Sequence, residues 1–448
     1  MTLFHESVLM SIQVDFMSQN KLEKFKKPFV VVGLGKSGMA AVQLLKNSGL
    51  SATEVLMFDE KKEGDLKSWE EITKLTPGTL VVSPGVPLKG LQIQKLTALG
   101  WGVTSEISLA CQFLSDEKLI GITGSVAKST VTSLVGAALL KDDPNAFVGG
   151  NLGVPFCEYA VGLQQGKAKA KYIVLELSSY QLENCKDLKL DNSAITYLSA
   201  NHLERYNSAD EYYMTKCLIG ERTKNICVLN SASEDNVKYA SRVPGKTLLT
   251  QAKTFSKPEL LQKVKLLGAH NKDNFCVAYE LVKATGLSDK AVMAMCEFTG
   301  LSHRIEFVGE HKQITFINDS KATAMDSVLV AVQAAQEKAG STGLVYSLLG
   351  GKDKALPWEE LRALAKEKQI QPVFFGACGE LAREKMQMLD RPYFTKLNDA
   401  LDSVFAKAKA HDVVLLSPGG TSLDEFKNFE DRGNFFKEKV KTFIQQNA

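Results

Sequence analysis

Residues 124–130 combine the side-chain types that bind phosphate. They read Gly-Ser-Val-Ala-Lys-Ser-Thr and lie between an apolar run and an expected helix. In such a loop, successive backbone N–H groups surround phosphate oxygens, a lysine neutralises their charge and a hydroxyl holds Mg²⁺. The spacing departs from the G-x-x-x-x-G-K-S/T pattern, and a β-carbon before the lysine costs about 1 kcal/mol if that position needs a positive φ. We predict a phosphate-binding loop made of Gly124, Ser125, Val126, Ala127, Lys128, Ser129 and Thr130.

A glycine-rich turn follows the first apolar run of the chain. The pattern is Gly33-x-Gly35-x-x-Gly38, and Asp59 ends the next apolar run. Glycines allow the backbone to approach a pyrophosphate at a helix N-terminus, and the carboxylate can reach a ribose or a base edge. The alternative is a tight turn without a ligand. The pattern favours a diphosphate and does not specifically indicate a nicotinamide.

Four further polar groups stand where the apolar pattern makes them notable. Glu176 closes the run YIVLEL, and a buried carboxylate is costly unless it is paired or bound to a metal. A Mg²⁺ ligand and a structural ion pair both remain open for it. His202 lies in an expected loop and Lys216 in an expected helix, where a structural histidine and a solvated lysine are the ordinary interpretations. Asp319-Ser320-Lys321 follows ITFIN, at a strand end where α/β sheets bind ligands.

The elements that must position these groups alternate between strands and helices, which indicates parallel sheets. Apolar runs predict strands at 29–32, 54–58, 79–82, 118–124, 172–177, 194–199, 225–230, 314–318, 344–351, 372–377 and 412–420. The stretch 298–312 is expected to connect two units. We therefore expect an α/β fold with three domains: a Rossmann-like N-terminal domain, a central P-loop ATPase-type domain and a Rossmann-like C-terminal domain. The expected boundaries are 1–27 (an N-terminal extension), 28–114, 115–301 and 302–448.

Composition limits the function classes. The 448 residues carry 54 Lys and Arg against 51 Asp and Glu, a net charge of +3 that gives no reason to expect a nucleic-acid partner. The sequence contains no run of about 18 apolar residues, so we expect no membrane-spanning helix. Eight cysteines without a C-x-x-C pair fit a reducing compartment. We expect a cytoplasmic monomer.

Nine motifs in one order resemble the Mur ligase family, in its D-glutamate-adding branch. The resemblance covers the chain from about residue 29 to the C-terminus, and the Asp-Asn-Pro-Arg motif of the diaminopimelate-adding branch is absent. The motifs are GITGSVAKSTVT (121–132), GGNLGVP (149–155), LELSSYQLE (175–183), NHLERY (201–206), GAHNKDN (268–274), GLSHRIE (300–306), INDSKAT (317–323), LLGGKDK (348–354) and LLSPGGTSLDEFKNFEDRGNFF (415–436).

The resemblance implies ATP-dependent amide bond formation in the synthesis of peptidoglycan precursors. ATP would phosphorylate the terminal carboxylate of UDP-N-acetylmuramoyl-L-alanine, and the amine of D-glutamate would attack the resulting acyl phosphate. Such catalysis consists mainly of positioning and charge neutralisation. The resemblance also implies two Mg²⁺ ions, with Mn²⁺ as an alternative, and carbamylation of Lys216.

The same resemblance assigns roles residue by residue. The implied catalytic residues are Lys128, Glu176, His202, Lys216, Arg304 and Lys321. The implied ATP site adds to the phosphate loop His270, Asn271, Asn274, Arg304 and Asp319. The implied metal ligands are Ser129, Thr130, Glu176, His202 and carbamylated Lys216. The implied sugar-nucleotide site is Gly35, Lys36, Ser37, Asp59, Ser83, Asn151 and His202. The implied D-glutamate site is Thr323, Lys354, Ser422 and Phe429.

Two alternatives remain, and departures from the family pattern motivate the first. Val126-Ala127 replaces the usual Asn-Gly, Asn201 replaces an aspartate before the histidine, and Glu204 replaces an aspartate after it. One alternative is a relative that binds the UDP-sugar but turns over ATP poorly. Under that hypothesis, Ala127→Gly lowers the KM for ATP. The other is an oxidoreductase that uses the first glycine turn, although the second phosphate loop argues against it.

Overall fold

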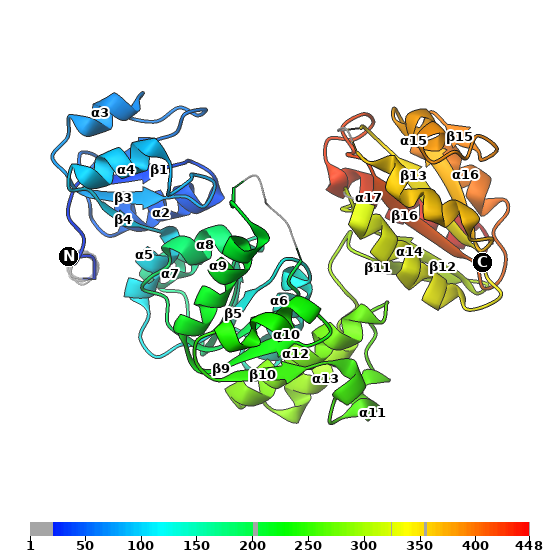
Figure 1. Cartoon of the computed structure of the whole chain (residues 1–448), viewed down its shortest axis with the longest axis horizontal. Helices are drawn as coiled ribbons and strands as arrows, with labels where there is room; N and C mark the ends of the chain where they lie inside the picture. The colour runs from blue at the N-terminus through cyan, green and yellow to red at the C-terminus, as the bar shows by residue number, and fades with distance from the viewer. Residues whose placement is uncertain (1–20, 200–204, 324, 354–355, 448) are drawn as a thin grey trace, which may run out of the picture. The chain divides into compact units, whose positions relative to one another are not determined.

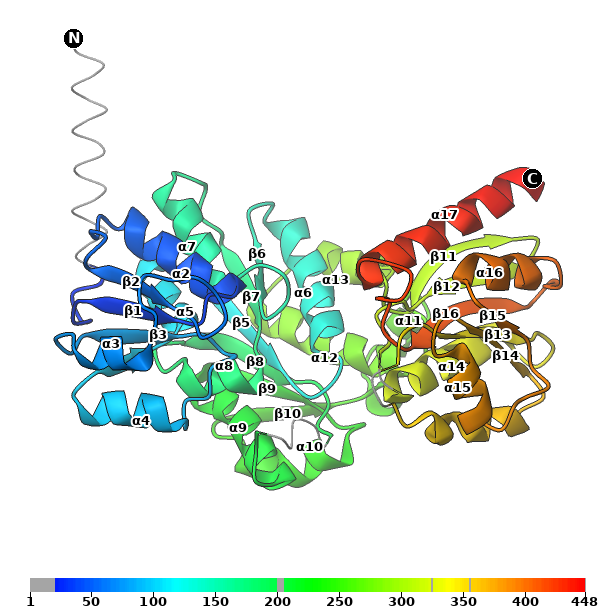
Figure 2. The same ribbon diagram turned by 90° about the horizontal axis from the view of Figure 1, so that it is seen from above.

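Three open sheets with flanking helices form the fold (Figures 1 and 2). The computed structural model describes residues 21–199, 205–323, 325–353 and 356–447. The chain divides into two compact units. Unit 1 comprises 1–261 and 273–295, and unit 2 comprises 262–272 and 296–448. The first two sheets belong to unit 1 and the third to unit 2.

The first sheet has four parallel strands in the order β2-β1-β3-β4. They span Phe29–Val32 (β1), Val55–Phe58 (β2), Thr79–Val82 (β3) and Gly102–Thr104 (β4). All residues of β1 and β3 are buried, as expected for central strands covered on both faces. The helices of this part are α2 (Lys36–Asn47), α3 (Trp69–Thr73), α4 (Leu91–Ala98) and α5 (Glu106–Ala110).

The second sheet has six parallel strands in the order β10-β9-β8-β5-β7-β6. They span Lys118–Thr123 (β5), Phe147–Gly150 (β6), Tyr172–Glu176 (β7), Leu190–Ile195 (β8), Thr223–Asn230 (β9) and Thr247–Thr250 (β10). The helices are α6 (Lys128–Asp142), α7 (Phe156–Gln164), α8 (Ser179–Asn184), α9 (Ala209–Glu221), α10 (Glu234–Tyr239), α11 (Pro258–Leu261), α12 (His270–Thr285) and α13 (Asp289–Glu297).

The expected strand at 194–199 is wrong in position, because β8 begins at Leu190. Its polar first half was not visible as a strand, yet each of those side chains has a partner. Asp191 accepts the backbone N–H of Leu119 at 2.9 Å, and Asn192 donates to the Thr285 hydroxyl at 3.2 Å. These contacts offset the cost of placing polar residues in a central strand.

The third sheet has the order β11-β12-β16-β13-β14-β15 and is parallel except where β11 pairs with β12. Its strands span Glu306–His311 (β11), Ile314–Asn318 (β12), Val345–Gly350 (β13), Ile370–Phe375 (β14), Tyr393–Phe394 (β15) and Val413–Gly419 (β16). The helices are α14 (Met325–Ala339), α15 (Gly379–Lys385), α16 (Leu397–Phe405) and α17 (Phe429–Asn447), with a 3₁₀ helix at Trp358–Lys366. The stretch 298–312, expected as a connection, thus also contributes an edge strand.

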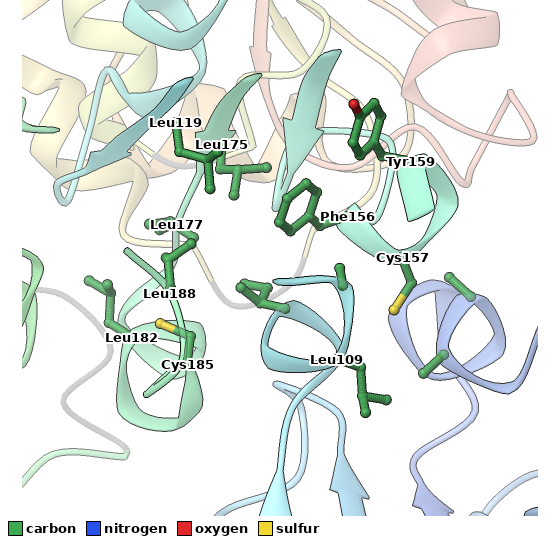
Figure 3. Packing of buried hydrophobic residues seen from close by; sticks show 14 of the residues in the cluster. Leu109, Leu119, Phe156, Cys157, Tyr159, Leu175, Leu177, Leu182, Cys185 and Leu188 are labelled. Carbon is green, nitrogen blue, oxygen red and sulfur yellow. The ribbon is translucent and has the colours of Figure 1, made fainter. Parts of the chain in front are cut away.

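One continuous hydrophobic core joins the first two sheets within unit 1. Figure 3 shows Leu109 of α5, Phe156 and Cys157 of α7, and Cys185 after α8 within this core. All eight cysteines are free thiols, and seven are buried. Burial raises the pKa of every one of them.

The expected α/β class with parallel sheets is confirmed. The domain boundaries at 28, 115 and 302 stay predictions. Among the described residues, no helix combines the length and apolar character needed to cross a membrane.

Candidate active site

The first glycine turn leaves the N-terminus of α2 open. Gly33 has φ +91°, and a β-carbon on Gly38 would lie 1.9 Å from the Gly33 carbonyl oxygen, so neither position tolerates a side chain without a backbone shift. Gly35 is the N-cap and supplies no side-chain cap, and the first turn of α2 has no acidic residue. Its free N–H groups and the helix dipole therefore favour an anion.

A cavity of about 610 Å³ lies beside this turn. It brings together all the residues predicted for the sugar-nucleotide site that the structure describes. These are Gly35, Lys36, Ser37, Asp59, Ser83 and Asn151. The second sheet contributes Asn151, which follows β6, so the cavity is shared by the two sheets of unit 1.

The Asp59 carboxylate holds the loops of this cavity. One oxygen accepts the backbone N–H of Leu34 at 2.7 Å, and the other accepts those of Lys61 and Lys62 at 2.8 and 3.1 Å. The bond from Leu34 is the main reason why the pKa of Asp59 lies below its usual value. The sequence suggested a ribose or base contact, and the structure shows this additional scaffolding role.

The phosphate loop is closely packed at its glycine. Gly124 has φ +147°, and a β-carbon there would lie 2.1 Å from the Thr196 hydroxyl oxygen. That hydroxyl donates to the Val126 carbonyl at 2.5 Å, and the Ser125 N–H donates to the Tyr197 carbonyl at 2.7 Å. Hydrogen bonds from the end of β8 and the residues after it therefore fix the course of the loop.

Ala127, the N-cap of α6, has φ +65° and ψ −1°. The left-handed conformation considered from the sequence is thus present, and a β-carbon there costs about 1–2 kcal/mol. The Lys128 ammonium donates to the carbonyls of Gly124 and Ser125 at 2.9 and 3.0 Å, so it lies over the loop. Ser129 is buried and Thr130 is half-buried at the start of the same helix.

Glu176, the last residue of β7, is 3% exposed. One carboxylate oxygen accepts a hydrogen bond from the Asn151 amide at 2.7 Å, and the other is buried without a hydrogen-bond partner. A buried carboxylate oxygen in this state fits a cation ligand, because an unpaired buried charge is otherwise costly. Asn151 thereby links the 610 Å³ cavity to the candidate metal ligand.

The interpretation of Lys216 as a solvated helix lysine is wrong. Its side chain is 1% exposed, and its ammonium lies 4.5 Å from the centre of the Tyr212 ring. Burial, together with the nearby positive charge of Lys128, moves the pKa of Lys216 well below its usual value, while Glu176 acts in the opposite direction. A lowered pKa favours the neutral form of the amine, which is its nucleophilic form.

Some predicted residues lie outside the part of the chain that the structure describes. His202 and Lys354 are among them, as are Asn201 and Glu204. Within the described part, no group of three or more His, Cys, Asp and Glu side chains forms a ready metal centre. The predicted metal ligands are not such a group, because they are mainly hydroxyls, Glu176 and a modified lysine.

Three of the residues predicted for the ATP site lie on the first turns of α12. His270 and Asn274 are one turn apart, and Asn271 and Asn274 are both buried. The Asn271 amide donates to the Leu267 carbonyl at 2.7 Å, which secures the helix start.

Arg304 lies in a short segment of unusual backbone geometry. His303 and Ile305, on either side of it, have φ +65° and +45°. Asp319 accepts the backbone N–H of Ile305 at 3.1 Å and the Ser417 hydroxyl at 2.8 Å. Burial raises the pKa of Asp319 to about 7, with Arg304 acting in the opposite direction. Asp319 therefore restrains the backbone on which Arg304 sits.

Of the residues predicted for D-glutamate, Thr323 follows β12, and Ser422 and Phe429 follow β16. The Lys321 ammonium lies 4.9 Å from the centre of the Phe429 ring, where α17 begins. Ser422 is buried and Thr323 is half-buried. The structure thus brings Lys321 and Phe429 together within unit 2.

Arg432 organises these loops, and we did not single it out from the sequence. It is fully buried, and its guanidinium donates to the Ser320 hydroxyl and carbonyl at 3.0 and 2.9 Å and to the Gly420 carbonyl at 3.1 and 3.2 Å. Burial lowers its pKa to about 10. Its only local signal is an arginine that follows Glu430 and Asp431, in a charged stretch typical of a solvated helix start.

Comparisons with known proteins cover most of the chain. Residues 122–282 match the family model of the Mur ligase middle domain, and residues 303–420 match that of the Mur ligase glutamate ligase domain. The UDP-N-acetylmuramoylalanine–D-glutamate ligase of Myxococcus xanthus (strain DK1622) is 34% identical, over 92% of this chain and 97% of its own. That of Elusimicrobium minutum (strain Pei191) is 32% identical, over 94% and 99%.

Solved structures agree at the level of the fold. MurF ligase from Thermotoga maritima in complex with ADP superimposes with a TM-score of 0.59 at 15% identity, over 95% of this chain and 97% of its own. The UDP-N-acetylmuramate–alanine ligase MurC from the same organism gives 0.55 at 17% identity, over 93% and 99%. With both family models matched in order and full-length relatives above 30% identity, the chain belongs to the Mur ligase family.

Proposed function

We propose that this protein is an ATP-dependent carbon–nitrogen ligase that adds D-glutamate to UDP-N-acetylmuramoyl-L-alanine in peptidoglycan precursor synthesis. One observation carries the proposal. Asn151 lines the 610 Å³ cavity and donates a hydrogen bond to Glu176. Glu176 and Lys128 of the phosphate loop are both close enough to Lys216 for their charges to shift its pKa, Glu176 upward and Lys128 downward. A sugar nucleotide in the cavity would thus have its far end beside the phosphate loop. The names of the full-length relatives support the same reaction.

The chain's residues divide the work of forming an amide bond. A carboxylate oxygen is a poor leaving group, so the alanine carboxylate attacks the γ-phosphorus of ATP and ADP departs. The amine of D-glutamate then attacks the acyl carbon, the tetrahedral intermediate expels phosphate, and the nitrogen loses a proton. Lys128 and the loop N–H groups neutralise the phosphate oxygens, and Asn151 orients the acceptor end of the substrate.

Glu176, Ser129 and Thr130 would hold Mg²⁺, and bound Mg²⁺ supplies further charge neutralisation at the phosphates. The unpartnered oxygen of Glu176 supports this assignment. We extend the proposal to a second ion, Mg²⁺ or Mn²⁺, at His202 and a carbamate formed from the neutral amine of Lys216 and CO₂. His270, Asn271, Asn274, Arg304, Asp319 and Lys321 would serve ATP and the transferred phosphoryl group. Thr323, Lys354, Ser422 and Phe429 would bind D-glutamate.

The remaining parts of the proposal concern the chain as a whole. We propose a cytoplasmic monomer whose domains are bounded near residues 28, 115 and 302. Unit 1 contains the first two sheets and unit 2 the third, which supports a boundary near residue 302.

Phosphate release tests the reaction. The protein is incubated with ATP, Mg²⁺ and UDP-N-acetylmuramoyl-L-alanine, with and without D-glutamate. We expect release that needs both acceptor substrates, and L-glutamate in place of D-glutamate serves as the matched control. Lys128→Met should abolish it because the phosphates lose their nearest positive charge.

The same assay addresses the alternatives. Absence of release with a folded protein would favour the relative that binds the UDP-sugar without efficient ATP turnover, an idea to which the full-length match with named ligases gives no support. An NADH titration addresses the oxidoreductase, for which a fluorescence change would be required.

A further inference from the structure

Two aromatic side chains line the 610 Å³ cavity where β2 ends and α3 begins. Phe58 is the last residue of β2 and Trp69 the first of α3. Their ring centres are 4.7 Å apart at an interplanar angle of 66°, an edge-to-face contact. The Trp69 indole N–H donates to a Glu60 carboxylate oxygen at 2.7 Å. Since its one donor has a partner, the indole has only its π surface to give to a ligand.

The rest of the cavity is suited to other parts of a sugar nucleotide. Lys36 and Ser37 lie at the open N-terminus of α2, which suits a pyrophosphate. Asn151 lies beside Glu176, where the reacting carboxylate must be. The part of the cavity near Trp69 lies at the end of β2, the edge strand of the first sheet. With the pyrophosphate and the carboxylate assigned, this part remains for the base.

An exposed leucine adds apolar surface to the same cavity. Leu91, the first residue of α4, is 82% exposed and lines the cavity together with Trp69. A planar base that covers such surface removes it from water and stacks on the indole, and both effects favour binding.

We propose that Trp69 is the base-binding wall of this site and stacks on the uracil ring, with Glu60 holding the indole in place. The inference rests on the proposed function, because it takes the ligand to be a uridine nucleotide. It adds a ligand contact for a residue that no motif of the family resemblance contains.

Tryptophan fluorescence reads this contact directly. The chain has three tryptophans, and Trp101 and Trp358 are 3% and 0% exposed. UDP should therefore quench the emission of Trp69, whereas inorganic pyrophosphate should bind the same protein without quenching. In Trp69→Phe the UDP-dependent quench should disappear while calorimetry still detects UDP. Trp358→Phe, which removes a buried indole from unit 2, should keep the quench.

Affinity gives a second readout. Trp69→Ala should weaken UDP binding about five- to 150-fold, the range that stacking of one base provides, and should leave pyrophosphate binding within twofold. Trp69→Phe should recover most of the loss, because a phenyl ring also stacks. Glu60→Ala should weaken UDP binding more than Glu60→Gln, which keeps an acceptor for the indole N–H. Trp69 is half-buried at the surface, and thermal melting checks that each variant is folded.

The outcomes separate the two proposals. If the unmodified protein does not bind UDP, the proposed function fails and the inference with it. If the protein binds UDP but Trp69→Ala binds it equally well and no quench occurs, the inference is overturned and the proposed function stands. An equal loss of UDP and pyrophosphate binding in Trp69→Ala would also overturn it, because the effect would not involve the base.

Discussion

Replacing Ala127 with glycine tests whether the β-carbon in the phosphate loop hinders ATP binding. Ala127 has φ +65° at the start of α6, and hydrogen bonds to Ser125 and Val126 hold the preceding loop. A β-carbon in the left-handed conformation costs about 1–2 kcal/mol. Glycine is also more flexible in other conformations, and this entropy offsets about 0.4–1 kcal/mol of the gain from removing the β-carbon. The net gain of about 0.5–1 kcal/mol corresponds to a two- to fivefold change in an equilibrium constant.

We expect this gain in ATP binding, because the strain at φ +65° in Ala127 opposes the loop conformation that binds the phosphate oxygens. In Ala127→Gly the KM for ATP should therefore fall two- to fivefold, while the KM values for the sugar nucleotide and D-glutamate stay constant. Steady-state phosphate release at saturating co-substrates gives all three. Ala127→Ser is the matched control, since it keeps the β-carbon.

Two results would refute the reasoning. If Ala127→Gly has an unchanged KM for ATP but a raised melting temperature, the strain at residue 127 is the same in the ATP-free and the ATP-bound protein. An equal fall of KM in Ala127→Ser would show that the β-carbon is not the cause.

Three other perturbations address the buried charges. Lys216→Arg should reduce phosphate release about 10- to 100-fold or more, because a guanidinium stays protonated and cannot capture CO₂; added bicarbonate should restore CO₂-depleted native protein but not the variant. Arg432→Met should lower the free energy of unfolding by about 2–4 kcal/mol in calorimetry, since acceptors on Ser320 and Gly420 lose their donors. Glu106 is buried, and burial raises its pKa from 4.5 to about 7. The folded state then holds a proton that the unfolded state has released, so stability falls as pH rises from 4.5 to 7, by up to about 3 kcal/mol. Glu106→Gln should remove that part of the loss, seen as a smaller difference in melting temperature between pH 5 and pH 8.

Each of these has an opposing result. Bicarbonate-independent activity in the native protein would contradict the carbamate. A calorimetric transition unchanged in Arg432→Met would contradict the bracing role of the guanidinium. Parallel melting curves of Glu106→Gln and the native protein across pH 5–8 would mean that this carboxyl titrates normally.

Strands were predictable where they are apolar throughout. Phe29–Val32 and Thr79–Val82 have the predicted bounds, because central parallel strands are buried on both faces and read as unbroken apolar runs. β8 begins four residues earlier than predicted, since the partners of Asp191 and Asn192 come from other elements and leave no local signal.

The site was predictable where its chemistry is local in sequence. The glycine turn and the phosphate loop each lie within one strand–helix connection, and the first glycine of each, Gly33 and Gly124, has a positive φ. Arg432 could not be found in this way, because its acceptor Ser320 is 112 residues away. The burial of Lys216 was equally hidden, because a lysine in a polar helix reads as solvated.

The buried thiols have a practical consequence for labelling. Maleimides and iodoacetamides react with thiolates. Seven of the eight native cysteines are buried and have raised pKa values, and the pKa of the half-buried Cys111 is raised as well. A cysteine introduced at Leu249 in unit 1 and another at Leu389 in unit 2, both exposed positions, would react far faster than any of them. The native chain can therefore carry a donor and an acceptor dye without prior removal of its own cysteines, and energy transfer between the dyes would follow the distance between the two units as each substrate is added.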